Sequence, residues 1–137
     1  MLIFSWVIFM KLIVCLDDNR GMLFNKRRQS RDRVLIENAL DYCKGEKLYT
    51  NEYSQKLFPE NSVEIFGSIQ EIGNDFCFAE NFTVDENTVD EIIVYKWNRV
   101  YPADTYFNIE LKNWHLTETD DFEGSSHEKI TREIYVR

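Results

Sequence analysis

Apolar and polar positions near the start of the chain predict a strand, a loop and a helix. Residues 11–16 are rich in Ile, Val and Leu and alternate little, which is typical of a central strand buried on both faces. Apolar residues recur at helical spacing over 34–43, with Ser30 expected as the N-cap and Gly45 closing the C-terminal end. We therefore expect a buried strand, then a basic loop, then an amphipathic helix.

Strands and helices continue to alternate in the next segment. Short strands are predicted over 47–50 and 62–66, and a short helix between them, over 51–58, is stopped by Pro59. This βαβαβ order implies right-handed crossovers and core strands that run parallel.

The pattern in the second half of the chain predicts strands. Segments 75–80 and 90–97 are strand-like, and 106–109, 114–119 and 129–136 follow with no helix between them. Antiparallel pairing is the economical arrangement for these last three, with 129–136 at or near the sheet edge. The whole pattern predicts an α/β fold, in which a central mixed sheet with crossover helices ends in a C-terminal antiparallel hairpin.

Composition and charge narrow the classes of partner. The 137 residues suit one domain, and a net charge of −8 repels phosphate backbones, so nucleic acid is not expected as a partner. Five cations between Lys26 and Arg33 form a local exception. They either hold an anionic group or make a solvated, ion-paired loop.

The apolar N-terminus raises the question of export. Residues 1–16 are nearly all apolar, but the run is short, contains Lys11 and continues into a strand, unlike a signal peptide or a spanning helix. We interpret 1–9 either as an extension upstream of a natural start at Met10 or as an added strand segment, and 10–137 as a single domain. No membrane partner is expected, and the expected location is cytoplasmic.

The cysteines and histidines are not spaced as metal ligands. Cys15, Cys43 and Cys77 lie far apart inside apolar patterns, as reduced core residues do. The chain has two histidines, His115 and His127, and no CxxC or Cys/His spacing, so no metal site is expected.

Several motifs resemble the dihydrofolate reductase family. The first strand ends at Asp18–Asn19–Arg20–Gly21–Met22, similar to the family's acidic and Gly-hydrophobe turn, and KLYTNEYSQKLF resembles its second strand and helix. DEIIVYKWNRVYPADTYF resembles a later strand and loop, with Asp104, Thr105 and Phe107 in step. The resemblance implies the family's fold, and it places Asp32 where the family's acid contacts a pterin.

Departures from the family bear on its cofactor. Where the family has two glycines that let the NADPH pyrophosphate approach the backbone, this chain has Ala79, Glu80, Asn81 and Phe82. The basic residue that opens the second helix is replaced by Asn51 and Glu52, and the ProTrp after the first turn by Asn25 and a cationic run. NADPH is therefore doubtful as a cofactor, and the cofactor stays unknown.

A second resemblance involves a group of short bacterial proteins labelled ribonuclease Z. It is carried by RRQSRDRVL, YPADTYF and GSSHEKIT. That label implies a metallo-β-lactamase fold with a HisXHisXAspHis motif, which two histidines do not supply. We treat the label as a name without a mechanism.

The resemblance implies a ligand cleft, for which Asp32 is the best candidate catalytic group. Its carboxylate would accept hydrogen bonds from a heterocycle, with the Tyr95 hydroxyl bridging to it. The expected ligand-binding residues are Met22, Leu23, Phe24, Arg28, Asp32, Ile36 and Tyr95, where 22–24 form a flap and Arg28 lies at the mouth with Arg27 and Arg31. Asp32, Tyr95 and the flap have plainer alternatives: a helix-start acid, a core aromatic and a permanently packed loop.

A hydrolase interpretation of GSSHEK fails on local geometry, because consecutive turn residues cannot form a relay, and His127 is expected on the surface. Three functions stay open. The first is binding of a small heterocyclic or nucleotide-like ligand near Asp32 without ordinary reductase activity. The others are binding of a basic protein, as immunity-type proteins do, and a divergent NADPH-dependent pterin reductase.

Overall fold

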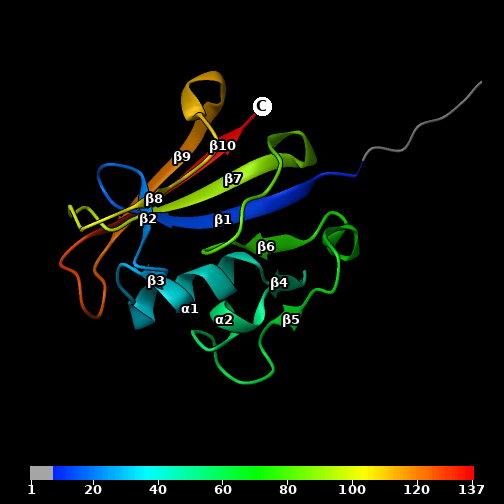
Figure 1. The fold of residues 1–137 in the computed structure, drawn as a ribbon, viewed down its shortest axis with the longest axis horizontal. Coiled ribbons are helices and arrows are strands. Elements are labelled where there is room, and N and C mark those ends of the chain that lie inside the picture. The colour runs from blue at the N-terminus through cyan, green and yellow to red at the C-terminus, as the bar shows by residue number, and fades with distance from the viewer. Residues whose placement is uncertain (1–7) are drawn as a thin grey trace, which may run out of the picture.

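A computed structural model of the chain describes residues 8–137. Its main sheet has seven strands in the order β5-β4-β6-β1-β7-β10-β9 (Figure 1). These strands are β1 (Met10–Leu16), β4 (Leu48–Thr50), β5 (Glu64–Ile65), β6 (Phe76–Phe78), β7 (Val89–Lys96), β9 (His115–Phe122) and β10 (Ile130–Val136). The helices are α1 (Arg33–Tyr42) and α2 (Glu52–Gln55), with short 3-10 turns η1 (Ile69–Ile72), η2 (Glu86–Thr88) and η3 (Leu111–Asn113).

Strand directions confirm the predicted mixed sheet. β1 pairs in parallel with β6 and β7, and β4 pairs in parallel with β5 and β6. β10 runs antiparallel to both β7 and β9, so it forms the predicted C-terminal hairpin and lies next to the edge strand. The sheet therefore has the parallel core and antiparallel end that the sequence pattern predicted.

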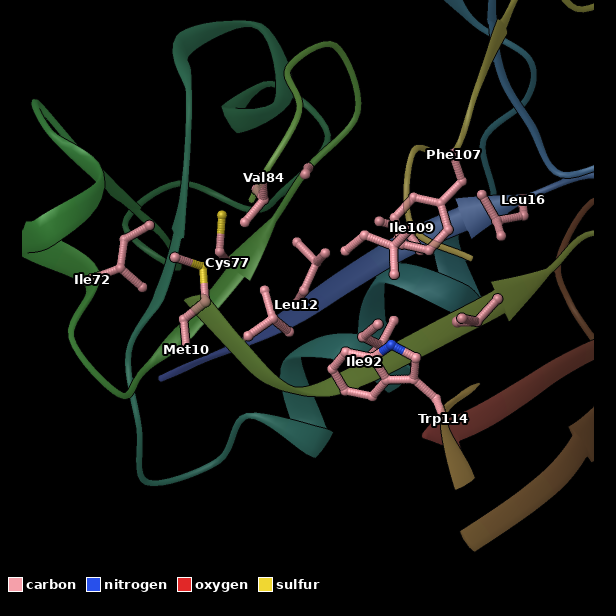
Figure 2. Packing of buried hydrophobic residues seen from close by; sticks show 14 residues of the cluster. Met10, Leu12, Leu16, Ile72, Cys77, Val84, Ile92, Phe107, Ile109 and Trp114 are labelled. Atoms are coloured by element: carbon pink, nitrogen blue, oxygen red, sulfur yellow. The ribbon is translucent and has the colours of Figure 1, made fainter. Parts of the chain in front are cut away.

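Two apolar cores cover the two faces of the sheet, because neighbouring residues of a strand point to opposite sides. On one face Ile13 of β1 packs with Leu35 and Ala39 of α1, all at most 1% exposed. Figure 1 shows α1 and α2 on this side of the sheet. On the other face, loop residues such as Phe107 and Trp114 cover β1 and β7 in place of a long helix (Figure 2).

The segment expected as a strand over 106–109 is mostly irregular. Only β8 (Thr105–Tyr106) is extended, and it joins β2 (Gly21–Phe24) and β3 (Arg27–Arg28) in a separate three-stranded sheet, β3-β2-β8. Beyond β8 the guanidinium of Arg20 donates to the carbonyl oxygens of Phe107 and Ile109. A tertiary contact therefore uses carbonyl groups that a strand ladder would need.

The expected cysteine environment is confirmed for two of the three thiols. Cys43 and Cys77 are buried in the cores, and burial raises the pKa of each thiol to about 12. Cys15 is half-buried. The interpretation of 1–9 as an upstream extension falls largely on residues 1–7, which lie outside the described part. Within 8–137, no helix has the length and apolar character needed to cross a membrane.

Candidate functional site

Asp32 is the N-cap of α1. Its backbone is extended, and its Oδ1 accepts hydrogen bonds from the N–H groups of Val34 at 3.0 Å and Leu35 at 3.2 Å. The prediction that Ser30 caps the helix is wrong, because the helix begins at Arg33 and Asp32 is the residue that satisfies its first N–H groups. An N-cap carboxylate also interacts favourably with the helix dipole.

The tip of the C-terminal hairpin closes over the same carboxylate. The N–H of Ser125 donates to Asp32 Oδ1 at 2.9 Å, and the N–H of Ser126 donates to Oδ2 at 2.8 Å. The Ser125 hydroxyl adds a third bond at 3.2 Å. A glycine at 124 is needed for this approach, since a Cβ there would lie 2.4 Å from Asp32 Oδ2. We call residues 124–127 the hairpin loop.

His127 completes the enclosure of Asp32. Its side chain is buried, its Nδ1 lies 3.0 Å from Asp32 Oδ2, and its ring stacks on Trp97 at 4.7 Å. The other ring nitrogen, Nε2, lies 2.9 Å from the Tyr101 hydroxyl and 3.2 Å from the Ser30 hydroxyl. The prediction that His127 is a surface group is wrong, because the hairpin loop folds it inward.

These contacts keep Asp32 ionised. Burial by itself raises the pKa of a carboxyl group, but the hydrogen bonds from Ser125, Ser126 and His127 outweigh it and hold the pKa of Asp32 well below its ordinary value. Both carboxylate oxygens are therefore used by groups of the protein. A heterocycle can bond to Asp32 as the resemblance implied only by displacing the hairpin loop.

Tyr95 does not bridge to Asp32. Its side chain is fully buried, and its hydroxyl donates to Asn38 Oδ1 of α1 at 2.6 Å. Desolvation raises the pKa of this phenol above its ordinary value. The alternative of a core aromatic with a satisfied hydroxyl describes Tyr95 better than the bridging role.

Four of the predicted ligand residues line one small cavity, and three do not. Met22, Arg28, Asp32 and Ile36 share a cavity of about 20 Å³, room for about one water molecule. Tyr95 lies in the core beneath α1. Leu23 and Phe24 lie in β2, with Leu23 buried and Phe24 exposed, so the expected flap is a strand of the small sheet.

Glu80 lies two residues after the end of β6. It is 8% exposed. Its carboxylate accepts hydrogen bonds from Arg28 Nε at 2.9 Å, from Arg28 Nη2 at 3.2 Å and from the Ser54 hydroxyl at 2.8 Å. Burial lowers the pKa of Arg28, but the hydrogen bond and charge of Glu80 raise it above its ordinary value overall. Arg28 is thus held by Glu80 and is not a free cation at a cleft mouth.

A larger groove opens beside Asp32, and we call it the α1 groove. Its volume is about 490 Å³, within the range of small-molecule sites. Its lining comes from α1 and the residues before it, the turn after α2, and the hairpin loop: Arg31, Asp32, Arg33, Ile36, Glu37, Leu57, Phe58, Pro59, Ser125 and Ser126. Arg33 pairs with Glu37, whereas Arg31 has no ion-pair partner among residues 8–137.

The architecture matches a known enzyme structure. Dihydrofolate reductase from Enterococcus faecalis, solved in complex with NADP(H) and RAB-propyl, superposes with a TM-score of 0.69 over 94% of this chain and 96% of that one. Sequence identity is 12%, so the likeness establishes the fold alone. No protein-family model matches the chain, and no curated protein matches it in sequence.

The next feature is the placement of side chains that could bind a metal ion. The described residues contain no group of three or more His, Cys, Asp or Glu side chains placed to hold a metal ion. His115 is exposed on the edge strand β9, and His127 is buried against Asp32, so the two histidines do not converge.

The residues that surround Asp32 are not predicted by the sequence pattern. Ser30 and Tyr101 were not assigned to the site, and the hairpin loop was interpreted as an ordinary turn. The run Gly124-Ser125-Ser126 carried the available signal, since small residues allow backbone N–H groups to approach an anion closely.

Proposed function

We propose that this domain binds a small ligand in the α1 groove beside Asp32. The groove itself carries the proposal: it offers an apolar floor from Ile36 and Phe58 and an unpaired cation, Arg31, at one side. Such a lining suits a compact heterocyclic or nucleotide-like molecule with an anionic substituent. Asp32 shapes this site by fixing the hairpin loop, which forms one wall.

Ordinary NADPH-dependent pterin reduction is not part of this proposal. A buried carboxylate, Glu80, held by Arg28 and Ser54, stands at the position that the resemblance assigns to close approach of the cofactor pyrophosphate. The cavity in front of Asp32, at about 20 Å³, is far smaller than a pterin ring. The side chains present therefore do not fit the family's cofactor, which also weighs against a divergent reductase.

Ligand binding is tested with a thermal-shift screen of pterins, nucleotides and aromatic carboxylates. We expect at least one compound to raise Tm, and Arg31→Glu to abolish that rise because it reverses the charge inside the groove. Lys26→Glu is the matched control, since it makes the same charge change at an exposed turn outside the groove and should keep the rise. A screen without any hit for the parent protein contradicts the proposal.

Binding of NADPH is tested separately. Titration with NADPH should give no saturable change in protein or nucleotide fluorescence, because the Glu80 side chain, held by Arg28 and Ser54, occupies the space that the pyrophosphate needs. Saturable binding at micromolar concentration would contradict this part of the proposal.

A second candidate function is binding of a basic protein partner. β9 is an edge strand whose first seven residues are all exposed, and Glu118, Asp120 and Asp121 lie on it. Such a strand presents free backbone groups together with negative charge. Pull-downs at low ionic strength should recover a basic partner that Asp120→Lys weakens and that Asp90→Lys, an exposed control on β7, does not. Recovery of no partner counts against this function.

A further inference from the structure

Ser30, His127 and Asp32 lie in the order of a nucleophile, a base and an orienting acid. The Ser30 hydroxyl lies 3.2 Å from His127 Nε2, and His127 Nδ1 lies 3.0 Å from Asp32 Oδ2. These are the distances at which a serine is activated for attack on a carbonyl. The three residues come from the loop before α1, the N-cap of α1 and the hairpin loop, so the fold assembles an order that no local motif contains.

The surroundings hold the relay in place. Asp32 is fixed by N–H groups of α1 and of the hairpin loop, and His127 is fixed between Asp32 and the Trp97 ring. A neutral imidazole that donates Nδ1–H to Asp32 leaves Nε2 as an acceptor. The geometry therefore supplies a base next to Ser30.

Ser30 also lies beside a cavity that could admit part of a ligand. It is half-buried, its hydroxyl has no other hydrogen-bond partner among the described residues, and it lines the cavity of about 20 Å³. That cavity shares Arg31, Asp32, Ile36 and Leu57 with the α1 groove, so the two spaces adjoin. The cavity beside Ser30 has room for one small group, such as a carbonyl oxygen or a water molecule.

Tyr101 competes for the same nitrogen. Its hydroxyl lies 2.9 Å from His127 Nε2, closer than Ser30, and a neutral imidazole nitrogen has one lone pair. Its backbone is held independently, because the Tyr101 N–H donates to Asp17 Oδ2 at 3.1 Å. Removal of this hydroxyl should leave Nε2 to Ser30 alone.

We propose that Ser30 is a catalytic nucleophile for hydrolysis of small esters that carry an anionic group, with His127 as its base and Asp32 as a positioning residue. The inference rests on the α1 groove binding a small ligand. Ser30 Oγ attacks the ester carbonyl carbon and its proton passes to His127 Nε2. The bond to the alcohol oxygen then breaks, and the alcohol leaves with that proton. Water attacks the acyl-serine, gives a proton to His127, and releases the carboxylic acid and the free Ser30 hydroxyl.

The test is labelling with a fluorophosphonate, followed by mass spectrometry of the peptide that carries the added phosphonyl group. We expect the label on Ser30, with its rate lowered about 100-fold or more in His127→Ala, the lower end of a general base's contribution. Ser30→Ala should lose the label, while Ser68→Ala, an exposed serine at the start of η1, should keep it. Tyr101→Phe should label several-fold faster.

Absence of a phosphonyl group on Ser30 of the parent protein overturns the inference, and this result does not depend on the folding of any variant. Retention of the label in Ser30→Ala also overturns it, as does slower labelling in Tyr101→Phe. The thermal-shift screen on the same preparation separates the two proposals. A ligand that raises Tm while Ser30 stays unlabelled refutes the nucleophile and leaves the groove proposal standing.

Discussion

Replacement of Asp32 by alanine should destabilise the fold strongly. The substitution removes an N-cap, worth about 1 kcal/mol. It also leaves the N–H groups of Ser125 and Ser126 and the buried His127 ring without their acceptor. Loss of one member of a buried, hydrogen-bonded charge network costs about 3–5 kcal/mol. We therefore expect about 4–6 kcal/mol in total, a large share of the 5–15 kcal/mol typical of a domain.

Urea unfolding followed by circular dichroism measures this change. Glu37→Gln is the matched control on the same helix, because it removes an exposed i,i+4 pair with Arg33 worth about 0.5 kcal/mol or less. If Asp32→Ala lowers the free energy of unfolding by no more than Glu37→Gln does, Asp32 is not enclosed as described. Because the variant disturbs the whole hairpin loop, lost ligand binding in it would not by itself identify a ligand contact.

Three further predictions follow from the same region and its neighbours. The pKa of Asp32 is lower in the folded state than in the unfolded state. The ionised carboxylate therefore stabilises the fold fully above the unfolded pKa, about 4, and this stabilisation is lost as the pH falls through the folded pKa. The difference in unfolding free energy between the parent and Asp32→Asn should shrink between about pH 4 and pH 2. Gly124→Ala should cost about 1–3 kcal/mol in urea unfolding, since its Cβ would meet Asp32 Oδ2, and an unchanged midpoint would contradict the close approach. Tyr95→Phe should cost about 1 kcal/mol through the lost bond to Asn38 and leave any ligand-induced Tm rise intact, whereas selective loss of that rise would restore Tyr95 as a ligand residue.

The sheet and the first helix were predictable because their signals are local. The apolar run that forms β1 and the helical spacing that forms α1 are set by residues a few positions apart. The order of elements then limited the topology to a parallel core with an antiparallel end. The failed strand at 106–109 shows the limit, since Arg20, from a turn far earlier in the chain, binds its carbonyl oxygens.

The candidate site was less predictable because its contacts are long-range. Asp32 was identified at the helix start, but its partners Ser125, Ser126 and His127 lie more than ninety positions away in the chain. Nothing in the local pattern of GSSHEK shows which surface the hairpin tip meets. His127 is buried because residues 125–127 of the hairpin loop contact Asp32 at the N-terminus of α1.

Amide hydrogen exchange at Ser125 and Ser126 tests most directly whether the hairpin loop encloses the Asp32 carboxylate. Both residues are exposed at the tip of a hairpin, so without these bonds their amide protons should exchange at the rate of an unstructured peptide. We predict slow exchange at both amides in the parent protein, and in Asp32→Asn fast exchange at the amide that loses its acceptor oxygen. Exchange at the unstructured rate in the parent would show that the carboxylate is open, and both the groove wall and the Ser30–His127–Asp32 relay would fall with it.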